Sequence, residues 1–203
     1  MLEPAGKRTS KPEAFTVEEL RRLASAAEGH RLESAFRLTL SGLRRSEVMG
    51  LQWEDFDGKR LAIRRSRVAV AKVGDSVGAT KTLRGSRILP LDDALARLLT
   101  AKRREAAAIA GWIVTDEYGR AISPEVYSDE WVELCKRAKV RPLDLRAARR
   151  SSVTHMREIG VPDHLVAAWH GHDEQVMRSF YSVALDDGLA AAGAQLGAIV
   201  ASS

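Results

Sequence analysis

Hydrophobic residues recur at helical spacing along most of the chain. The first such stretch follows Thr16, which is predicted to form a capping box with Glu19, and its apolar positions 17, 20, 23, 24 and 27 give one buried face. The same spacing predicts further helices over about 32–41, 46–51, 92–108, 123–138, 144–159 and 162–170, and a last helix that carries Tyr181. The chain is therefore predicted to be mainly α-helical.

Three short segments depart from this spacing and are typical of strands. They are residues 61–63, 68–70 and 86–89, and Gly74, Gly78 and Gly85 mark the turns between them. We expect a small antiparallel sheet of three strands inside a helical protein. The predicted fold class is thus α+β, mainly α-helical.

The ends of the chain differ in composition from its middle. Residues 1–15 are polar and contain Pro4, Gly6 and Pro12, so we expect a linker or tail. Residues 16–185 form one predicted domain, and the Ala-rich residues 186–203 a C-terminal helical segment. In isolation that segment is expected to pack on its own domain.

The composition favours a polyanionic partner. The net charge is +5, the pI is about 9.6, and 24 of the 32 basic residues are arginine. The arginine bias suits bidentate phosphate contacts, and a GC-rich genome is the alternative explanation for it. Cys135 is the only cysteine, which excludes an intramolecular disulfide and a cysteine-based zinc site. With no membrane-length apolar run and no signal-peptide pattern, we expect a soluble protein of the cytoplasm.

Four blocks place polar side chains where they can meet a ligand. Arg44 lies on the connection after Gly42, with Glu47 three residues later, and Lys81 lies on a predicted β-turn. Arg146 opens a helix, whose amino-terminal amides also favour an anion. Taken singly, each block also fits a plainer interpretation: a solvated helix end, a basic hairpin, or an amphipathic helix.

The fourth block contains two histidines and a tyrosine. His170 and His172 flank Gly171, and Tyr181 follows nine residues after His172. No further ligand follows at a recognised metal spacing, so no metal site is predicted. A single tyrosine is usually a packing residue, so the weight of Tyr181 comes from the set.

Together, Arg44, Lys81, Arg146, His172 and Tyr181 would form a cationic cup with one nucleophile. Two guanidinium groups can hold the non-bridging oxygens of a phosphodiester, and a phenol can attack phosphorus. A lysine or histidine can protonate the leaving oxygen. Such a set can cleave a phosphodiester with neither a metal nor another cofactor.

These blocks resemble those of the tyrosine recombinases, the family of phage integrases and chromosome-dimer resolution enzymes. The family pattern G-L-R-x-S/G-E, then L-x-W-x-D, matches residues 42–47 and 51–55. The hairpin pattern K-T-x-x-S-x-R, ending in P-L, matches residues 81–87 and 90–91. The second arginine in D-L-R matches Arg146, and the late histidine and tyrosine match His172 and Tyr181. The resemblance runs from Thr16 to Ala184.

Two departures from the family pattern stand out. The family has a histidine three residues before the second arginine, and here that position is Leu143. His170 replaces the usual leucine before Gly-His, and we leave open whether it is a substituted contact or a spare proton carrier. Residues 1–15 cannot form the amino-terminal DNA-binding domain of family members, so we expect an isolated catalytic domain or a short member.

The resemblance implies a site-specific recombinase that acts on double-stranded DNA as a homo-oligomer, a tetramer. Tyr181 would form a 3′-phosphotyrosine, Arg44, Arg146 and His172 would hold the phosphate, and Lys81 would protonate the leaving oxygen, without metal or ATP. Glu47 and His170 are assigned supporting roles. The residues predicted to contact DNA are Arg45, Arg84, Arg87, Arg149 and Arg150. The 186–203 segment would dock on a neighbouring protomer, and the setting would be a bacterial nucleoid, with a host- or phage-encoded protein.

Two rival functions remain open from the sequence. A type IB-like topoisomerase shares this chemistry without a partner site. A catalytically impaired DNA-binding protein would account for Leu143.

Overall fold

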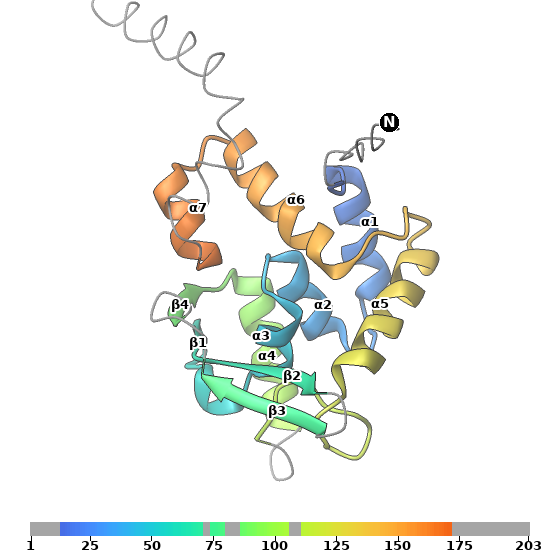
Figure 1. The fold of residues 1–203 in the computed structure, drawn as a ribbon, viewed down its shortest axis with the longest axis vertical. Helices are drawn as coiled ribbons and strands as arrows, with labels where there is room; N and C mark the ends of the chain where they lie inside the picture. The colour runs from blue at the N-terminus through green and yellow to red at the C-terminus, as the bar shows by residue number, and fades with distance from the viewer. Residues whose placement is uncertain (1–12, 71–73, 80–85, 106–110, 172–203) are drawn as a thin grey trace, which may run out of the picture.

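The computed structural model describes residues 13–70, 74–79, 86–105 and 111–171, and Figure 1 shows a mainly helical chain with short strands gathered on one side. The helices are α1 (Val17–Ala27), α2 (Glu33–Leu40), α3 (Arg45–Met49), the short 3-10 helix η1 (Trp53–Asp55), α4 (Asp93–Glu105), α5 (Pro124–Arg137), α6 (Leu145–Glu158) and α7 (Asp163–His170). The strands are β1 (Arg60–Ile63), β2 (Arg65–Val70), β3 (Gly74–Ala79) and β4 (Arg87–Pro90). The predicted α+β class is confirmed.

Local hydrogen bonds explain why several helices begin where the sequence predicts. The amide of Glu19 donates to Thr16 Oγ1 at 3.2 Å and the amide of Thr16 donates to Glu19 Oε2 at 2.8 Å, which is the predicted capping box. Ser123 before α5 and Asp144 before α6 each accept a hydrogen bond from an amide of the first turn. These amides have no partner inside the helix, so a polar side chain just before it stabilises its start.

The described strands form two antiparallel pairs, β1 with β4 and β2 with β3, where the sequence predicted one sheet of three. The predicted strands correspond to β1, β2 and β4. Strand β3, with the sequence GDSVGA, was not predicted because its glycines and aspartate indicate turns. Backbone pairing along β2, from Arg65–Ala79 to Val70–Gly74, forms it despite that composition.

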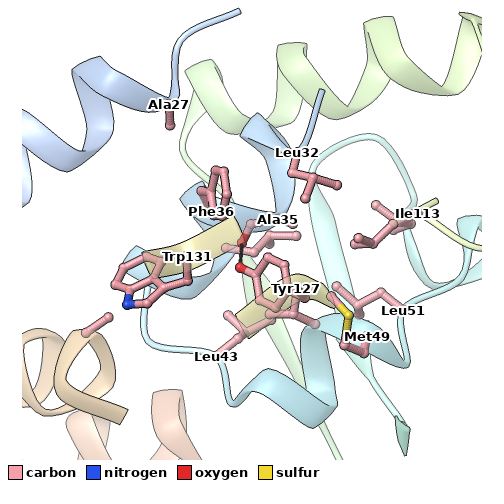
Figure 2. Packing of buried hydrophobic residues seen from close by; sticks show 14 of the residues in the cluster. Ala27, Leu32, Ala35, Phe36, Leu43, Met49, Leu51, Ile113, Tyr127 and Trp131 are labelled. Carbon is pink, nitrogen blue, oxygen red and sulfur yellow. Dashed lines mark hydrogen bonds between the residues drawn. The ribbon is translucent and has the colours of Figure 1, made fainter. Parts of the chain in front are cut away.

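An aromatic cluster forms the centre of the main core (Figure 2). Phe36 of α2 stacks on Tyr127 of α5 with ring centroids 5.7 Å apart, and Phe15 meets Trp131 edge-on. Phe15, which the sequence assigned to the tail, is buried, and its amide donates to Ser151 Oγ of α6 at 2.7 Å. The packed part of the chain therefore includes the last residue of the predicted tail.

The second half of the first sequence motif is structural. Leu51 and Trp53 are buried in the core, and the buried carboxylate of Asp55 accepts from the amide of Gln52 at 2.9 Å. Arg65 of β2 approaches the same carboxylate at 3.5 Å. This packing ties α3 and η1 to the strands, so the residues before Leu51 have a fixed position.

We expect Tyr127→Phe to lower the free energy of unfolding by about 1–3 kcal/mol, measured by urea denaturation. The buried Tyr127 hydroxyl lies 2.6 Å from Thr39 Oγ1 and donates to the carbonyl of Ala35 at 3.0 Å, so the change leaves buried polar groups unpaired. Burial also raises the pKa of Tyr127, so the phenol stays neutral. Tyr118→Phe, at a residue that is 68% exposed, is the control and should change stability by less than about 0.5 kcal/mol. Equal effects of the two changes would contradict this account.

Candidate active site

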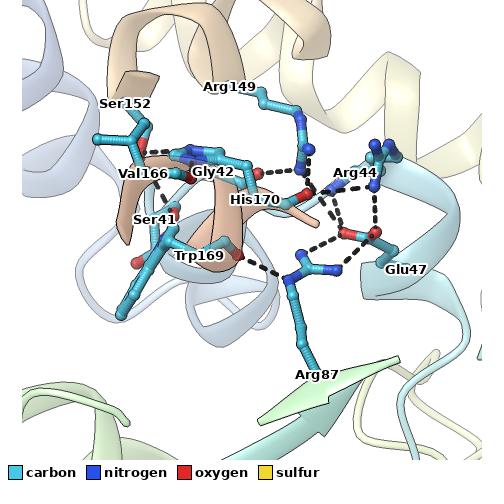
Figure 3. Close-up of polar contacts among 10 residues, drawn as sticks. All are labelled: Ser41, Gly42, Arg44, Glu47, Arg87, Arg149, Ser152, Val166, Trp169 and His170. Carbon is cyan, nitrogen blue, oxygen red and sulfur yellow. Dashed lines mark hydrogen bonds and ion pairs between the residues drawn. The ribbon is translucent and has the colours of Figure 1, made fainter. Parts of the chain in front are cut away.

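A buried carboxylate is approached by arginines from the start of α3, from β4 and from α6. The Glu47 side chain is only 3% exposed, and it accepts hydrogen bonds from the Arg44 amide at 2.9 Å and from Arg44 Nη1 at 2.7 Å. Arg87 of β4 donates through Nη1 at 3.1 Å and through Nη2 at 3.0 Å. Arg149 Nη1 of α6 lies 3.9 Å from Glu47 Oε2. Figure 3 shows these three guanidinium groups around the single carboxylate.

The pKa of Glu47 reflects a balance between burial and positive charge. Burial raises this pKa, but the hydrogen bonds and charge of Arg87, the Arg44 amide and the charge of Arg149 together lower it to about 2. The carboxylate is therefore ionised at neutral pH and offsets the repulsion among the arginines. Burial and the nearby charge of Arg44 lower the pKa of Arg149 to about 9, which still leaves its guanidinium group charged at neutral pH.

The carboxyl-terminal end of α7 covers the other side of these arginines (Figure 3). Arg87 Nε donates to the carbonyl of Trp169 at 2.6 Å, and Arg149 Nη2 donates to the carbonyl of His170. Carbonyls in the last turn of a helix lack partners within the helix, so the guanidinium groups complete their hydrogen bonding. Helix α7 then ends at Gly171, whose φ of 60° is the left-handed conformation common at helix ends.

His170 links α7 to α6 through its ring. The side chain is fully buried, with Nδ1 2.9 Å from the carbonyl of Val166 and Nε2 3.1 Å from Ser152 Oγ. A carbonyl only accepts, so Nδ1 carries a proton, and in the neutral ring Nε2 accepts from the serine hydroxyl. Of the two roles left open by the sequence, this geometry supports the substituted packing contact.

Gly42 permits this packing of the His170 ring. Its φ is +96°, a conformation that favours glycine, and a Cβ at this position would lie 2.5 Å from His170 Nε2 and 2.8 Å from Ser152 Oγ. Its carbonyl accepts a hydrogen bond from Arg149 Nη1 at 2.7 Å. The neighbouring Ser41 carbonyl accepts from the Trp169 indole at 2.8 Å. The turn before Arg44 is thus held from both α6 and α7.

Arg44 and Glu47 lie together, as their spacing predicted. The Arg44 side chain is 41% exposed. Arg87 and Arg149, predicted as DNA contacts, belong to the same cluster, but their side chains are only 8% and 10% exposed. Both donate to groups of the protein: Arg87 to Glu47 and to the carbonyl of Trp169, and Arg149 to the carbonyls of Gly42 and His170.

Arg146, the predicted partner of Arg44, is not one of the arginines around Glu47. Its side chain is exposed, and within the described ranges it makes no hydrogen bond or ion pair. Arg149, one helical turn later, is the arginine that α6 turns toward Arg44. Leu143 also lies elsewhere, because its side chain packs against the main core and its carbonyl accepts from Trp131 Nε1 at 2.9 Å.

The other predicted residues fall into two groups, and the first consists of two arginines that donate hydrogen bonds to other groups of the protein. Arg45 Nη1 donates to Ser128 Oγ at 2.8 Å, and Arg150 Nε donates to the carbonyl of Glu13 at 2.9 Å. The second group lies outside the described residues and consists of Lys81, Arg84, His172 and Tyr181.

Sequence reasoning did not assign Ser41, Ser152 or Trp169 to this site. They act through a backbone carbonyl, a hydroxyl and an indole, and no spacing of such groups identifies them in advance. The sequence did contain a signal that Arg149 faces the interior, because its helical neighbours Ala147, Ala148 and Ser151 are small. All three are buried in the structure.

Outside this cluster, the described residues offer few reactive groups. Burial, with a smaller contribution from the charge of Glu19, raises the pKa of the buried Cys135 thiol to about 11, so the thiol stays protonated. Within the described ranges, no three His, Cys, Asp or Glu side chains are grouped so that they could hold a metal ion. Among the described helices, none combines the length and apolar character needed to cross a membrane.

A helical domain that gathers arginines from three elements around one acid provides a site suited to a phosphate group. The chain belongs to the phage integrase family, whose model matches residues 13–186. The predicted family resemblance is thereby confirmed.

Individual relatives agree with this membership. The chain is 28% identical over 193 residues to a tyrosine recombinase XerC-like protein of Caldanaerobacter subterraneus subsp. tengcongensis, a match that covers 83% of this chain and 49% of the relative. The chain therefore spans about half the length of this relative.

Two solved structures share the fold. The Tn1549 transposon integrase in complex with transposon right end DNA has a TM-score of 0.75 at 17% identity, over 86% of this chain and 62% of that one. A lambda integrase tetramer bound to a Holliday junction has a TM-score of 0.55 at 18% identity, over 84% of this chain and 50% of that one.

We expect Glu47→Gln to lower the free energy of unfolding at pH 7 by about 3–5 kcal/mol, because the change leaves buried guanidinium groups without a counter-charge. The pKa of Glu47 falls from an ordinary 4.5 to about 2 on folding, so its contribution is fully present above pH 4.5 and is lost as the pH falls through about 2. Urea denaturation at pH 7 and at about pH 3 should show the gap between wild type and variant narrowing in acid.

Glu54→Gln is the matched control for this experiment. Glu54 also pairs with an arginine, but its side chain is 63% exposed, so its loss should change stability by less than about 1 kcal/mol. A gap for Glu47→Gln that stays the same at both pH values would show that the charge of the carboxylate is not what stabilises the cluster.

Proposed function

We propose that this chain is the catalytic domain of a site-specific DNA recombinase, which cleaves and rejoins double-stranded DNA through a 3′-phosphotyrosine intermediate. The observation that carries the proposal is the gathering of Arg44, Arg87 and Arg149 around Glu47 in a member of the phage integrase family. These three cations and one anion leave a net charge of +2. That excess suits a phosphodiester, whose oxygens gain negative charge during transfer.

Arg44 and Arg149 are the arginines that we assign to the two non-bridging phosphate oxygens. Arg44 Nη1 lies 3.4 Å from the carbonyl of His170, the same oxygen to which Arg149 donates, so the two guanidinium groups approach one point. Residues 146–149, Arg-Ala-Ala-Arg, then have the spacing of the family pattern H-x-x-R, with Arg146 in the histidine position. In this register the exposed Arg146 replaces an imidazole donor, and Leu143 is no departure from the pattern.

Tyr181, His172 and Lys81 complete the mechanism on the basis of the family resemblance. The Tyr181 oxygen attacks phosphorus and loses its proton to water, while the bond from phosphorus to the 5′ oxygen breaks. Lys81 protonates that departing oxygen, and His172, which directly follows Gly171, donates a hydrogen bond to the phosphate. The new phosphotyrosyl ester is a phosphodiester like the bond it replaces, so rejoining requires no nucleotide.

The partners follow from the charge of the chain and from its relatives. The net charge of +5 favours DNA, and the two solved structures hold transposon right end DNA and a Holliday junction, the latter bound by a tetramer. We therefore assign double-stranded DNA as the substrate and a tetramer as the active assembly, in which residues 186–203 of one protomer contact the next. The corresponding location is the bacterial cytoplasm, at the nucleoid.

The two rival functions are less well supported. A catalytically impaired DNA-binding protein was suggested by Leu143, but this residue is partly buried and packs against the main core, and it is not part of the arginine cluster. A topoisomerase would relax plasmids without joining two sites, whereas the XerC-like relative is a recombinase by name. Recombination of a plasmid that carries two copies of the target separates these activities.

We expect Tyr181→Phe to abolish a covalent protein–DNA adduct while leaving DNA binding intact, because the change removes only the attacking oxygen. A target is first selected from a randomised duplex library by binding to the protein and is then supplied as a nicked suicide duplex. The adduct is measured on a denaturing gel, and Tyr118→Phe serves as the control that should retain it. If wild type binds this DNA but forms no adduct, or if Tyr181→Phe still forms one, the proposed mechanism is wrong.

We expect Arg149→Lys to slow adduct formation by about 10²–10³-fold, because a lysine cannot reproduce two guanidinium donors. Arg146→Lys should slow it by less than about tenfold, since the side chain is exposed and keeps its charge. Single-turnover rates on the nicked duplex and thermal unfolding are measured for both variants. The opposite order of effects in two folded variants would restore Arg146 as the second arginine.

A further inference from the structure

Arg87 pairs with Glu47 through both of its Nη atoms and also binds the end of α7. Nη1 and Nη2 donate to the two carboxylate oxygens of Glu47 at 3.1 and 3.0 Å, and Nε donates to the carbonyl of Trp169 at 2.6 Å. The side chain is only 8% exposed. One planar group thus connects β4 to both α3 and the last turn of α7, as Figure 3 shows.

This environment is unsuited to a DNA contact. Within the cluster, Arg44 has the most exposed side chain, at 41%, and Arg149 makes no hydrogen bond to Glu47, from which it lies 3.9 Å, so neither has to give up two hydrogen bonds to a buried carboxylate in order to meet a phosphate. To bind DNA directly, Arg87 would have to release Glu47. The Glu47 carboxylate, which is only 3% exposed, would then have one partner fewer. Breaking a buried ion pair in this way is strongly unfavourable.

We propose that Arg87 is a positioning residue, which holds the Glu47 carboxylate and the end of α7 in a fixed relation so that Arg44 and Arg149 present their donors to one phosphate. The proposal rests on the recombinase function proposed above. Glu47 contacts Arg44 directly and Arg149 at 3.9 Å, so its placement by Arg87 is passed on to both.

The chemistry of this position requires an arginine. The two Nη atoms lie in one plane and match the two oxygens of a carboxylate, while Nε points along the side of the same plane toward a third acceptor. A lysine ammonium group keeps the charge but is a single point, so it cannot donate to both Glu47 oxygens and to the Trp169 carbonyl in the same geometry. Arg87→Lys therefore separates the positioning role from the charge.

The end of α7 is where such positioning has an effect on catalysis. The Trp169 carbonyl that Arg87 holds is next to His170, whose carbonyl accepts from Arg149. Gly171 follows, and then His172, which we assign to the phosphate. A shift of this turn would alter the point at which the guanidinium groups converge, and displacements of about 1 Å in such groups can cost about 10²-fold in rate.

The test uses the full chain and the selected nicked duplex. In the Arg87→Lys variant we expect the single-turnover rate of adduct formation at saturating DNA to fall by about 10- to 100-fold. In the Tyr181→Phe background, which prevents cleavage, the same change should leave DNA affinity within about twofold and the salt dependence of binding unaltered. Arg64→Lys, at a side chain that is 56% exposed, is the control for a surface arginine and should keep the wild-type rate.

A direct DNA contact predicts a different result. Weaker binding for Arg87→Lys, a salt slope reduced by about one and an unchanged rate at saturation would overturn the proposal. Hydrogen exchange provides a readout independent of cleavage: amides at 167–171 should exchange faster in Arg87→Lys while those of α5 do not. Unchanged exchange at 167–171 would also overturn it. A wild-type chain that forms no adduct would sink the recombinase function alone, because the exchange experiment still decides the role of Arg87.

Discussion

Three guanidinium groups can lie this close together, two of them nearly buried, only if negative charge lies between them, and in this chain Glu47 supplies that charge. Its carboxylate is 3% exposed; burial raises its pKa, but the hydrogen bonds and the positive charge around it lower this pKa to about 2. The cluster is left with more positive than negative charge, which an exposed arginine such as Arg44 carries to the surface. In the proposed recombinase, a phosphate arriving there would meet donors whose positions were fixed when the protein folded, so that little reorganisation would be needed during the reaction.

The same arginines also provide hydrogen-bond donors for backbone carbonyls at the end of α7. The last turn of every helix has carbonyl groups without helical partners, and at the end of α7 the carbonyls of Trp169 and His170 accept from Arg87 and Arg149. Positive charge near a helix carboxyl terminus is favourable in addition, because the helix dipole is negative there. The helix end and the acid–arginine cluster therefore stabilise each other, and a change in one is expected to be felt in the other.

The first motif illustrates how one short stretch serves both stability and chemistry. Gly42 makes room for the His170 ring, and Glu47 holds the arginines, whereas Leu51 and Trp53 lie in the core. The resemblance to the tyrosine recombinases depends on both kinds of residue. Family membership follows from the whole pattern, but the role of each residue follows only from where its side chain points.

By itself, the sequence determined the described α-helices and nearly where they start, three of the four described strands, and the family. These features depend on neighbours a few residues apart: the Thr16–Glu19 capping box, the apolar spacing of α1, and motifs with fixed internal spacing. The sequence did not predict strand β3, because the composition of this segment indicates turns and only its pairing with β2 makes it a strand.

Only the tertiary structure decided which arginine lies beside Arg44. Arg146, Arg149 and Arg150 are one turn or less apart on α6, and the sequence gives all three the same charge and a helical setting. Packing of α6 against α2 and α7 buries Arg149 and leaves Arg146 exposed. Likewise, the sequence suggests a DNA contact for Arg87. In the structure, its side chain pairs in the interior with Glu47 and donates to the Trp169 carbonyl, which are 40 and 82 positions away along the chain. Long-range burial and charge pairing decided these roles, and no local pattern encodes them.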